Sequence, residues 1–149
     1  MKMKKLAALL CALILCLAGL TAIAEDMTTE KGDIDMQMMI GETPVTVAWE
    51  DNASVEALKT LAAEGIAIEM SMYGGFEQVG SIGQSLPRDD QQTTTTSGDI
   101  VLYSGNQLVV FYGSNSWAYT RLGHITDQTP EQMKALLGSG DVTITLSIK

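Results

Sequence analysis

The feature that most restricts the fold of this chain is a series of short segments that are apolar throughout or at every second position. The segments fall at residues 36–40, 43–49, 66–72, 79–82, 99–104, 107–113, 117–122 and 141–149. Successive side chains of a strand point to opposite faces, so each segment predicts a strand with one apolar face. Such strands are typical of antiparallel sheets that cover a core on one side.

Two further segments have helical spacing. Residues 52–64 carry one apolar stripe, with Asp51 or Asn52 before it as the cap and Gly65 after it as the stop. Residues 129–132 read Thr-Pro-Glu-Gln, the pattern of a capping box with proline at the first helical position. The sequence therefore predicts two short helices among the strands.

The sequence also predicts the connections between these segments. Gly41-Glu42 is short enough to join the first two strands as a hairpin. Gly105-Asn106 suits the positive φ angles of a tight turn between the strands at residues 99–104 and 107–113. Residues 86–98 are polar and include a run of threonines, which predicts a long loop.

Together these elements predict a mainly β fold. About eight strands with one apolar face each suit a closed antiparallel barrel, with the two short helices covering its ends. The length of the chain is enough for one such core and too short for two stable ones.

The N-terminal residues predict export. A short cationic start precedes an apolar run at residues 6–20, which is shorter than the roughly 20 residues of a membrane-spanning helix. Ala22 and Ala24 supply the small residues of a signal-peptidase site. We therefore expect residues 1–24 to be a signal peptide of a secreted or extracytoplasmic protein, with an uncleaved anchor as the alternative. Residues 25–35 are polar and predict a flexible leader.

The charge and the cysteine content of the mature chain limit the kinds of ligand and partner that we expect. Both cysteines, Cys11 and Cys16, lie in the signal segment, so the mature chain has none. Loss of the three N-terminal lysines leaves six basic against 18 acidic residues, a net charge near −12. Nucleic acid and membrane surfaces are poor partners for such a chain. One histidine, His124, and no phosphate-binding loop predict no metal site and no cofactor, with His124 an ordinary strand-end residue.

Four segments carry a resemblance to a known family. They are residues 98–106 (Gly-Asp-Ile-Val-Leu-Tyr-Ser-Gly-Asn), 108–113 (Leu-Val-Val-Phe-Tyr-Gly), 117–123 (Trp-Ala-Tyr-Thr-Arg-Leu-Gly) and 73–77 (Tyr-Gly-Gly-Phe-Glu). In these segments the chain resembles the bacterial cyclophilin-like domain proteins, which share the eight-stranded barrel of peptidyl-prolyl isomerases. The resemblance implies a cyclophilin-like domain at residues 36–149. Related domains are attached to redox proteins such as flavodoxins, which implies an accessory role.

The resemblance also bears on activity. An active cyclophilin carries a Phe-His-Arg segment whose arginine stabilises the twisted prolyl amide, and the nearest counterpart here is Gly75-Phe76-Glu77 without a basic residue. We therefore expect a non-enzymatic module that binds a small molecule, a peptide or a partner protein. A divergent peptidyl-prolyl isomerase is the alternative, and a small-molecule enzyme using Arg88 or Arg121 is a weaker one.

Six residues are candidates for a ligand site. Aromatic and cationic side chains can hold a planar or apolar ligand by stacking and cation–π contact. The candidates are Tyr73 and Phe76 beside two glycines, Arg88 on the long loop, and Trp117, Tyr119 and Arg121 on one face of a strand. A structural role is the alternative for the last three, with the aromatic rings filling the core and Arg121 reaching water.

Overall fold

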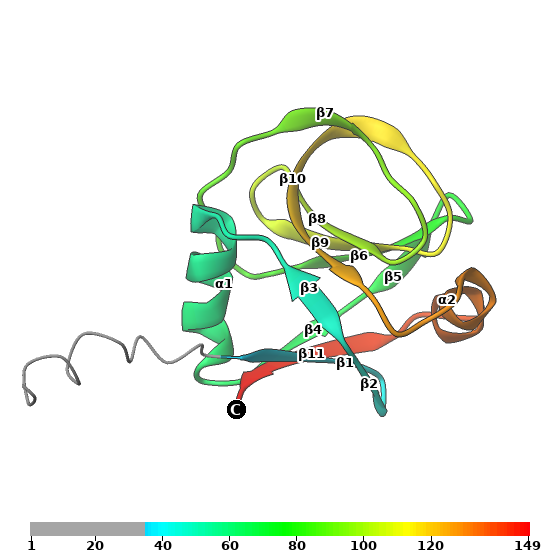
Figure 1. The fold of residues 1–149 in the computed structure, drawn as a ribbon, viewed down its shortest axis with the longest axis horizontal. Coiled ribbons are helices and arrows are strands. Elements are labelled where there is room, and N and C mark those ends of the chain that lie inside the picture. Colours follow the sequence, from blue (N-terminus) through cyan, green and yellow to red (C-terminus); the bar gives the residue numbers. More distant parts are fainter. Residues whose placement is uncertain (1–34) are drawn as a thin grey trace, which may run out of the picture. The chain divides into compact units, whose positions relative to one another are not determined.

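The computed structural model describes residues 35–149, which form one compact unit of eleven strands and two helices (Figure 1). The predictions for residues 1–24, and for all but the last residue of the leader, lie outside the described residues. The strands are β1 (Met36–Ile40), β2 (Thr43–Val45), β3 (Val47–Trp49), β4 (Ile66–Glu69), β5 (Ser71–Tyr73), β6 (Glu77–Ser81), β7 (Gln91–Thr94), β8 (Asp99–Tyr103), β9 (Gln107–Phe111), β10 (Ser116–Ile125) and β11 (Thr143–Ile148); the helices are α1 (Ala53–Ala62) and α2 (Pro130–Leu137).

The strands form two antiparallel sheets. The smaller sheet has the order β2-β1-β11-β4. The last strand of the chain, β11, therefore lies between β1 and β4 (Figure 1). The larger has the order β3-β10-β8-β9-β6-β5, with β7 paired to the first half of β10. The mainly β, antiparallel prediction is confirmed. Within residues 35–149 no ladder joins the two ends of either sheet, so the closed barrel is not confirmed.

Two predicted strands are each divided between the sheets. Residues 43–49 separate at Thr46 into β2, which pairs with β1, and β3, which pairs with β10. Residues 66–72 separate at Met70 into β4 and β5. The prediction of single strands was wrong here because alternation is a local pattern, whereas the choice of sheet depends on partners far away in the sequence.

The second division, at Met70, changes which side chains of this segment are buried. Met70 is buried, as predicted, but Met72, placed with it on one face by alternation, is 38% exposed. Gly80 on β6 lies against the end of β4 and Met70. A Cβ atom there would stand 2.5 Å from the Met70 sulfur and 2.6 Å from the Glu69 carbonyl oxygen, so only glycine fits.

The predicted loop at residues 86–98 was wrong in part, because it contains β7. Thr93 and Thr95 are buried, and the Thr95 backbone amide and hydroxyl both donate to the Asn115 carbonyl oxygen. Threonine has a high strand propensity, and its hydroxyl can be satisfied by backbone groups. The polar composition of this stretch therefore concealed a strand.

Both helices have the predicted ends. The Asn52 side chain accepts a hydrogen bond from the Val55 amide at 2.9 Å and caps α1, while Gly65 has a φ of +73° just after it. Thr129 and Gln132 form a complete capping box at α2. Apolar residues of both helices, among them Leu58 and Leu137, are fully buried in the main core.

The turn between β8 and β9 sits one residue earlier than predicted. The positive φ angles belong to Ser104 (+53°) and Gly105 (+74°), not to Gly105 and Asn106. In this hairpin Val101 faces Val109, and Leu102 faces Leu108. Side chains therefore point alternately to two faces that pack in two separate apolar clusters, the larger of which is the main core.

Candidate functional site

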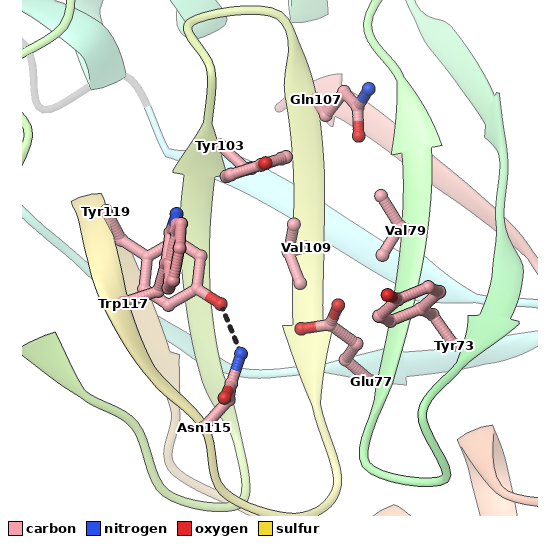
Figure 2. Close-up of a pocket in the computed structure, with 9 residues that line it drawn as sticks. All are labelled: Tyr73, Glu77, Val79, Tyr103, Gln107, Val109, Asn115, Trp117 and Tyr119. Carbon is pink, nitrogen blue, oxygen red and sulfur yellow. Dashed lines mark hydrogen bonds between the residues drawn. The ribbon is translucent and has the colours of Figure 1, made fainter.

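A pocket of about 410 Å³ lies on the face of the larger sheet that points away from the main core (Figure 2). We name it the aromatic pocket. Its lining residues come from β5, β6, β8, β9, β10 and the loop before β10: Tyr73, Glu77, Val79, Tyr103, Gln107, Val109, Asn115, Trp117 and Tyr119.

Strand register explains why these residues meet. Residues directly opposite each other on antiparallel strands share a face. Glu77 on β6 stands opposite Tyr73 on β5, and the next residue on that face, Val79, stands opposite Val109 on β9. Gln107 stands opposite Tyr103 on β8. The pocket is therefore a patch of one sheet face, completed by the N-terminal half of β10.

The aromatic side chains occupy different depths. The Tyr119 ring is buried and makes edge contacts with the rings of Phe111 at 5.7 Å and Tyr103 at 6.1 Å between centroids. Its hydroxyl accepts a hydrogen bond from the Asn115 side-chain nitrogen at 2.9 Å. Trp117 and Tyr73 are 57% and 65% exposed. The pocket thus has a packed aromatic floor and two exposed aromatic rings at its mouth.

The acidic group of the pocket is the carboxyl of Glu77. The residue is 6% exposed, and its Oε2 atom is buried without a hydrogen-bond partner. In Figure 2 the carboxyl projects from β6 toward the side that carries Asn115 and Tyr119. Burial raises the pKa of Glu77 from 4.5 to about 7. Burial also raises the pKa of Tyr119, and the nearby Glu77 adds to that rise.

A second pocket, of about 450 Å³, lies between the start of α1, residues 87–93 and β10. We name it the polar pocket. Arg88, Arg121 and the buried Tyr119 are among its lining residues. The Arg88 guanidinium is held by an ion pair with Asp90, and its Nε donates to the Asp90 carboxylate at 2.9 Å. Arg88 therefore already has an anionic partner within its own segment.

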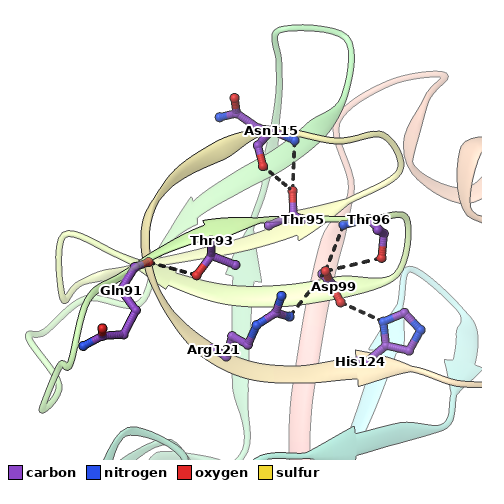
Figure 3. A network of polar contacts seen from close by, with 8 residues as sticks. All are labelled: Gln91, Thr93, Thr95, Thr96, Asp99, Asn115, Arg121 and His124. Atoms are coloured by element: carbon purple, nitrogen blue, oxygen red, sulfur yellow. Dashed lines mark hydrogen bonds and ion pairs between the residues drawn. The ribbon is translucent and has the colours of Figure 1, made fainter.

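Arg121 also has an anionic partner, Asp99, in the network of polar contacts shown in Figure 3. The buried Asp99 carboxylate accepts a hydrogen bond from the Thr96 amide at 2.9 Å, lies 2.8 Å from His124 Nδ1 and pairs with Arg121 at 3.4 Å. The register of β10 shifts between Arg121 and Gly123, which lets residues three apart reach the same carboxylate. His124 lies near the end of β10, as predicted, and contacts this carboxylate.

The structure brings together some of the six predicted site residues. Tyr73, Trp117 and Tyr119 line the aromatic pocket, whereas Arg88 and Arg121 line the polar pocket together with Tyr119. Phe76 lines neither pocket and packs against the smaller cluster, with its ring 6.3 Å from that of Tyr73.

Sequence reasoning missed most of the pocket. Glu77 was noticed only as a residue in place of a base, and alternation along residues 77–81 could have placed it on the face of Val79. Alternation from Val101 could similarly have placed Tyr103. Asn115 follows no pattern, because it lies in a loop before β10. Asp99 also gave no signal, since its partners are brought to it by the irregular register of β10.

Residues 35–149 contain no cluster of three or more His, Cys, Asp or Glu residues placed to hold a metal ion. Neither α1 nor α2, the helices of that part of the chain, is long and apolar enough to cross a membrane. The expectation of no cofactor stays a prediction.

Comparison with known protein families matches residues 38–147 to the cyclophilin-like family. This stretch is well over half of the 149-residue chain, and the chain belongs to the cyclophilin-like family. No curated protein and no solved structure matches the chain. The resemblance carried by the strand segments is therefore confirmed for the family, whose fold does not by itself specify an activity.

Proposed function

We propose that this domain is a non-enzymatic binding module whose site is the aromatic pocket. The observation that supports this most is the combination of a buried aromatic floor with exposed Trp117 and Tyr73 at the mouth. A volume of about 410 Å³ is in the range typical of small-ligand sites. The occupant is a small molecule, a peptide side chain or a segment of a partner protein.

The lining residues favour binding over prolyl isomerisation. By resemblance, an active cyclophilin needs an arginine donor beside the prolyl amide. The residues that line the aromatic pocket include no Arg, Lys or His, and Glu77 follows Phe76 where that donor segment would begin. An acidic group without a basic neighbour does not supply the donor that this reaction requires.

We also propose that the domain acts outside the cytoplasm. The support is the cationic start, apolar run and small residues of positions 1–24. Mass spectrometry of the exported protein should find a chain that begins at Glu25. An exported protein that retains residues 1–24 would contradict this part of the proposal.

Tryptophan fluorescence offers a direct test of binding, because the chain has two tryptophans in different places. Trp49 packs against the main core and its Nε1 donates to the Met36 carbonyl oxygen at 2.9 Å, whereas Trp117 lines the pocket. In a Trp49→Phe variant, small amines, acids and neutral aromatics are titrated while Trp117 emission is recorded. A saturable change with at least one class is expected; no saturable change with any class would contradict the proposal.

A coupled proline-isomerisation assay separates the two functions. We expect no rate above background for the wild-type domain. A measurable rate that is lost in Trp117→Ala would overturn the non-enzymatic assignment and favour the divergent isomerase.

A further inference from the structure

The buried carboxyl of Glu77 lacks a partner that its position requires. Buried polar groups in folded proteins almost always have a hydrogen-bond partner, and each exception calls for an explanation. Glu77 is more than nine-tenths buried, its Oε2 has no donor, and its neighbours on the same face include Val79, Val109 and Phe111. An apolar residue would fill this position at lower cost. A ligand that supplies the missing donor would explain the carboxyl.

The rest of the pocket indicates the charge of that ligand. Aromatic faces attract cations, and the pocket is lined by Tyr73, Tyr103, Trp117 and Tyr119. No residue among its lining carries a positive charge, and the whole chain has a formal net charge of −9. An anionic ligand would be repelled by Glu77, whereas a cation would be attracted both by the carboxylate and by the rings.

We propose that the aromatic pocket binds an organic cation with N–H donors, an ammonium or guanidinium group on an apolar stem, with Glu77 as its counter-ion. This inference rests on the proposed function of the pocket as a ligand site. The cation donates to the free Oε2, and the stem packs on Val79, Val109 and the aromatic rings. Such a group is found on free amines and on lysine or arginine side chains of peptides.

Binding should depend on pH through Glu77. The cation needs the ionised carboxylate, and burial raises the pKa of Glu77 to about 7. The other titratable groups that line the pocket are the phenols of Tyr73 on β5, Tyr103 on β8 and Tyr119 on β10. Affinity should therefore rise with pH between about 5 and 8, and binding at pH 7 should release about half a proton per site.

The experiment compares three probes of similar shape in the Trp49→Phe background. They are 2-phenylethylammonium, the neutral 2-phenylethanol and the anionic 3-phenylpropionate, titrated at pH 8 with Trp117 emission as the signal. The expected result is that the cation binds at least about tenfold more tightly than the alcohol, the scale of one charge-assisted hydrogen bond, and that the anion binds weakest. A tripeptide with a central lysine, with and without Nε-acetylation, distinguishes a peptide source from a free amine.

Glu77→Gln removes the charge and keeps the shape, so it should abolish the preference for the cation over the alcohol. Glu64→Gln is the matched control, because Glu64 is exposed just beyond α1. A wild-type titration at pH 5 serves as a second test that needs no variant, and the preference should shrink there too. Equal binding of cation and alcohol at pH 8 would overturn the cation assignment but leave the binding function intact. If none of the probes and neither tripeptide binds, the cation assignment and the proposed binding function are both overturned.

Discussion

Strands β8 and β9 have two faces whose apolar residues are equally buried but belong to clusters of very different size. On one face Ile100, Leu102, Leu108 and Val110 are fully buried in the main core. On the other, Val101, Val109 and Phe111 are buried as completely, in a small cluster that borders the aromatic pocket. The apolar strand pattern is continuous, yet only one face is closed by a second sheet and two helices.

The difference shows how one sheet can separate stability from binding. The core face gains its free energy from complete burial, in proportion to the apolar area removed from water. The other face leaves its aromatic rings partly uncovered at Trp117 and Tyr73, and it contains the partnerless Glu77. Substitutions on the two faces should therefore have different consequences.

The largest effect is expected from Leu108→Ala on the core face. The side chain is completely buried, so the variant loses its transfer free energy and leaves a cavity. The free energy of unfolding, measured by denaturant titration, should fall by about 2–5 kcal/mol, while binding of 2-phenylethylammonium to the folded variant stays unchanged. Val109→Ala, one residue away on the pocket face, removes a smaller but equally buried side chain, so it should lose less stability, and it should lose more binding. Equal losses of stability and binding in the two variants would remove the distinction between the faces.

The next effect concerns the pH dependence of stability. Glu77 has a pKa of about 7 in the folded chain against 4.5 for an ordinary glutamate, so the folded state holds the proton more tightly. Its contribution to stability is complete below about pH 4.5 and is lost as the pH rises through 7, by up to about 3 kcal/mol.

Glu77→Gln should remove this pH-dependent contribution to the free energy of unfolding. The difference in unfolding free energy between variant and wild type should therefore shift in favour of the variant between pH 4.5 and 8. Because the other titrating groups are shared, they cancel in that difference. A difference that stays constant across this range would show that Glu77 does not have a raised pKa.

A smaller effect is expected at the polar network beside the pocket. Asp99→Ala leaves the Thr96 amide without its acceptor and should cost about 1–3 kcal/mol of stability. Arg121→Ala should cost less than about 1 kcal/mol, because that side chain is 44% exposed and its ion pair is screened by water. Denaturant titration of both variants checks the order. A larger loss of stability in Arg121→Ala than in Asp99→Ala would show that the arginine contributes more to the stability of this network than the aspartate.

The smallest effect on stability is expected at the mouth of the pocket. Trp117 is 57% exposed, so Trp117→Ala should change the free energy of unfolding by less than about 0.5 kcal/mol. Binding of 2-phenylethylammonium, measured by calorimetry, should weaken by about three- to tenfold through loss of the cation–π contact. Unchanged binding with reduced stability would mean that Trp117 serves the fold.

Features set by neighbouring residues could be predicted from the sequence. Asn52, Thr129 and Gln132 signalled the helix starts, and alternation located segments of most strands, because capping and side-chain direction are decided within a few residues. The division of strands at Thr46 and Met70 could not be predicted, since it depends on which distant strand each half pairs with.

The site was predicted only in part for the same reason. Tyr73, Trp117 and Tyr119 were recognised because aromatic side chains beside glycines or on one face of a strand can stack on a ligand. Glu77 was missed as a ligand group, because its burial follows from its position between β5 and β9 and is invisible in the local sequence. Arg121 was grouped with the aromatic stripe, but the irregular register of β10 directs it to Asp99.

The most direct test of the two-face account is a methyl-resolved NMR titration of the wild-type domain with 2-phenylethylammonium at pH 8. Val79 and Val109 line the pocket, whereas Ile100, Leu102 and Leu108 point into the main core. The account predicts saturable shifts of the methyl signals of Val79 and Val109, with those of Ile100, Leu102 and Leu108 nearly unmoved. Shifts centred on the core residues, or no saturable shift at Val79 and Val109, would contradict it.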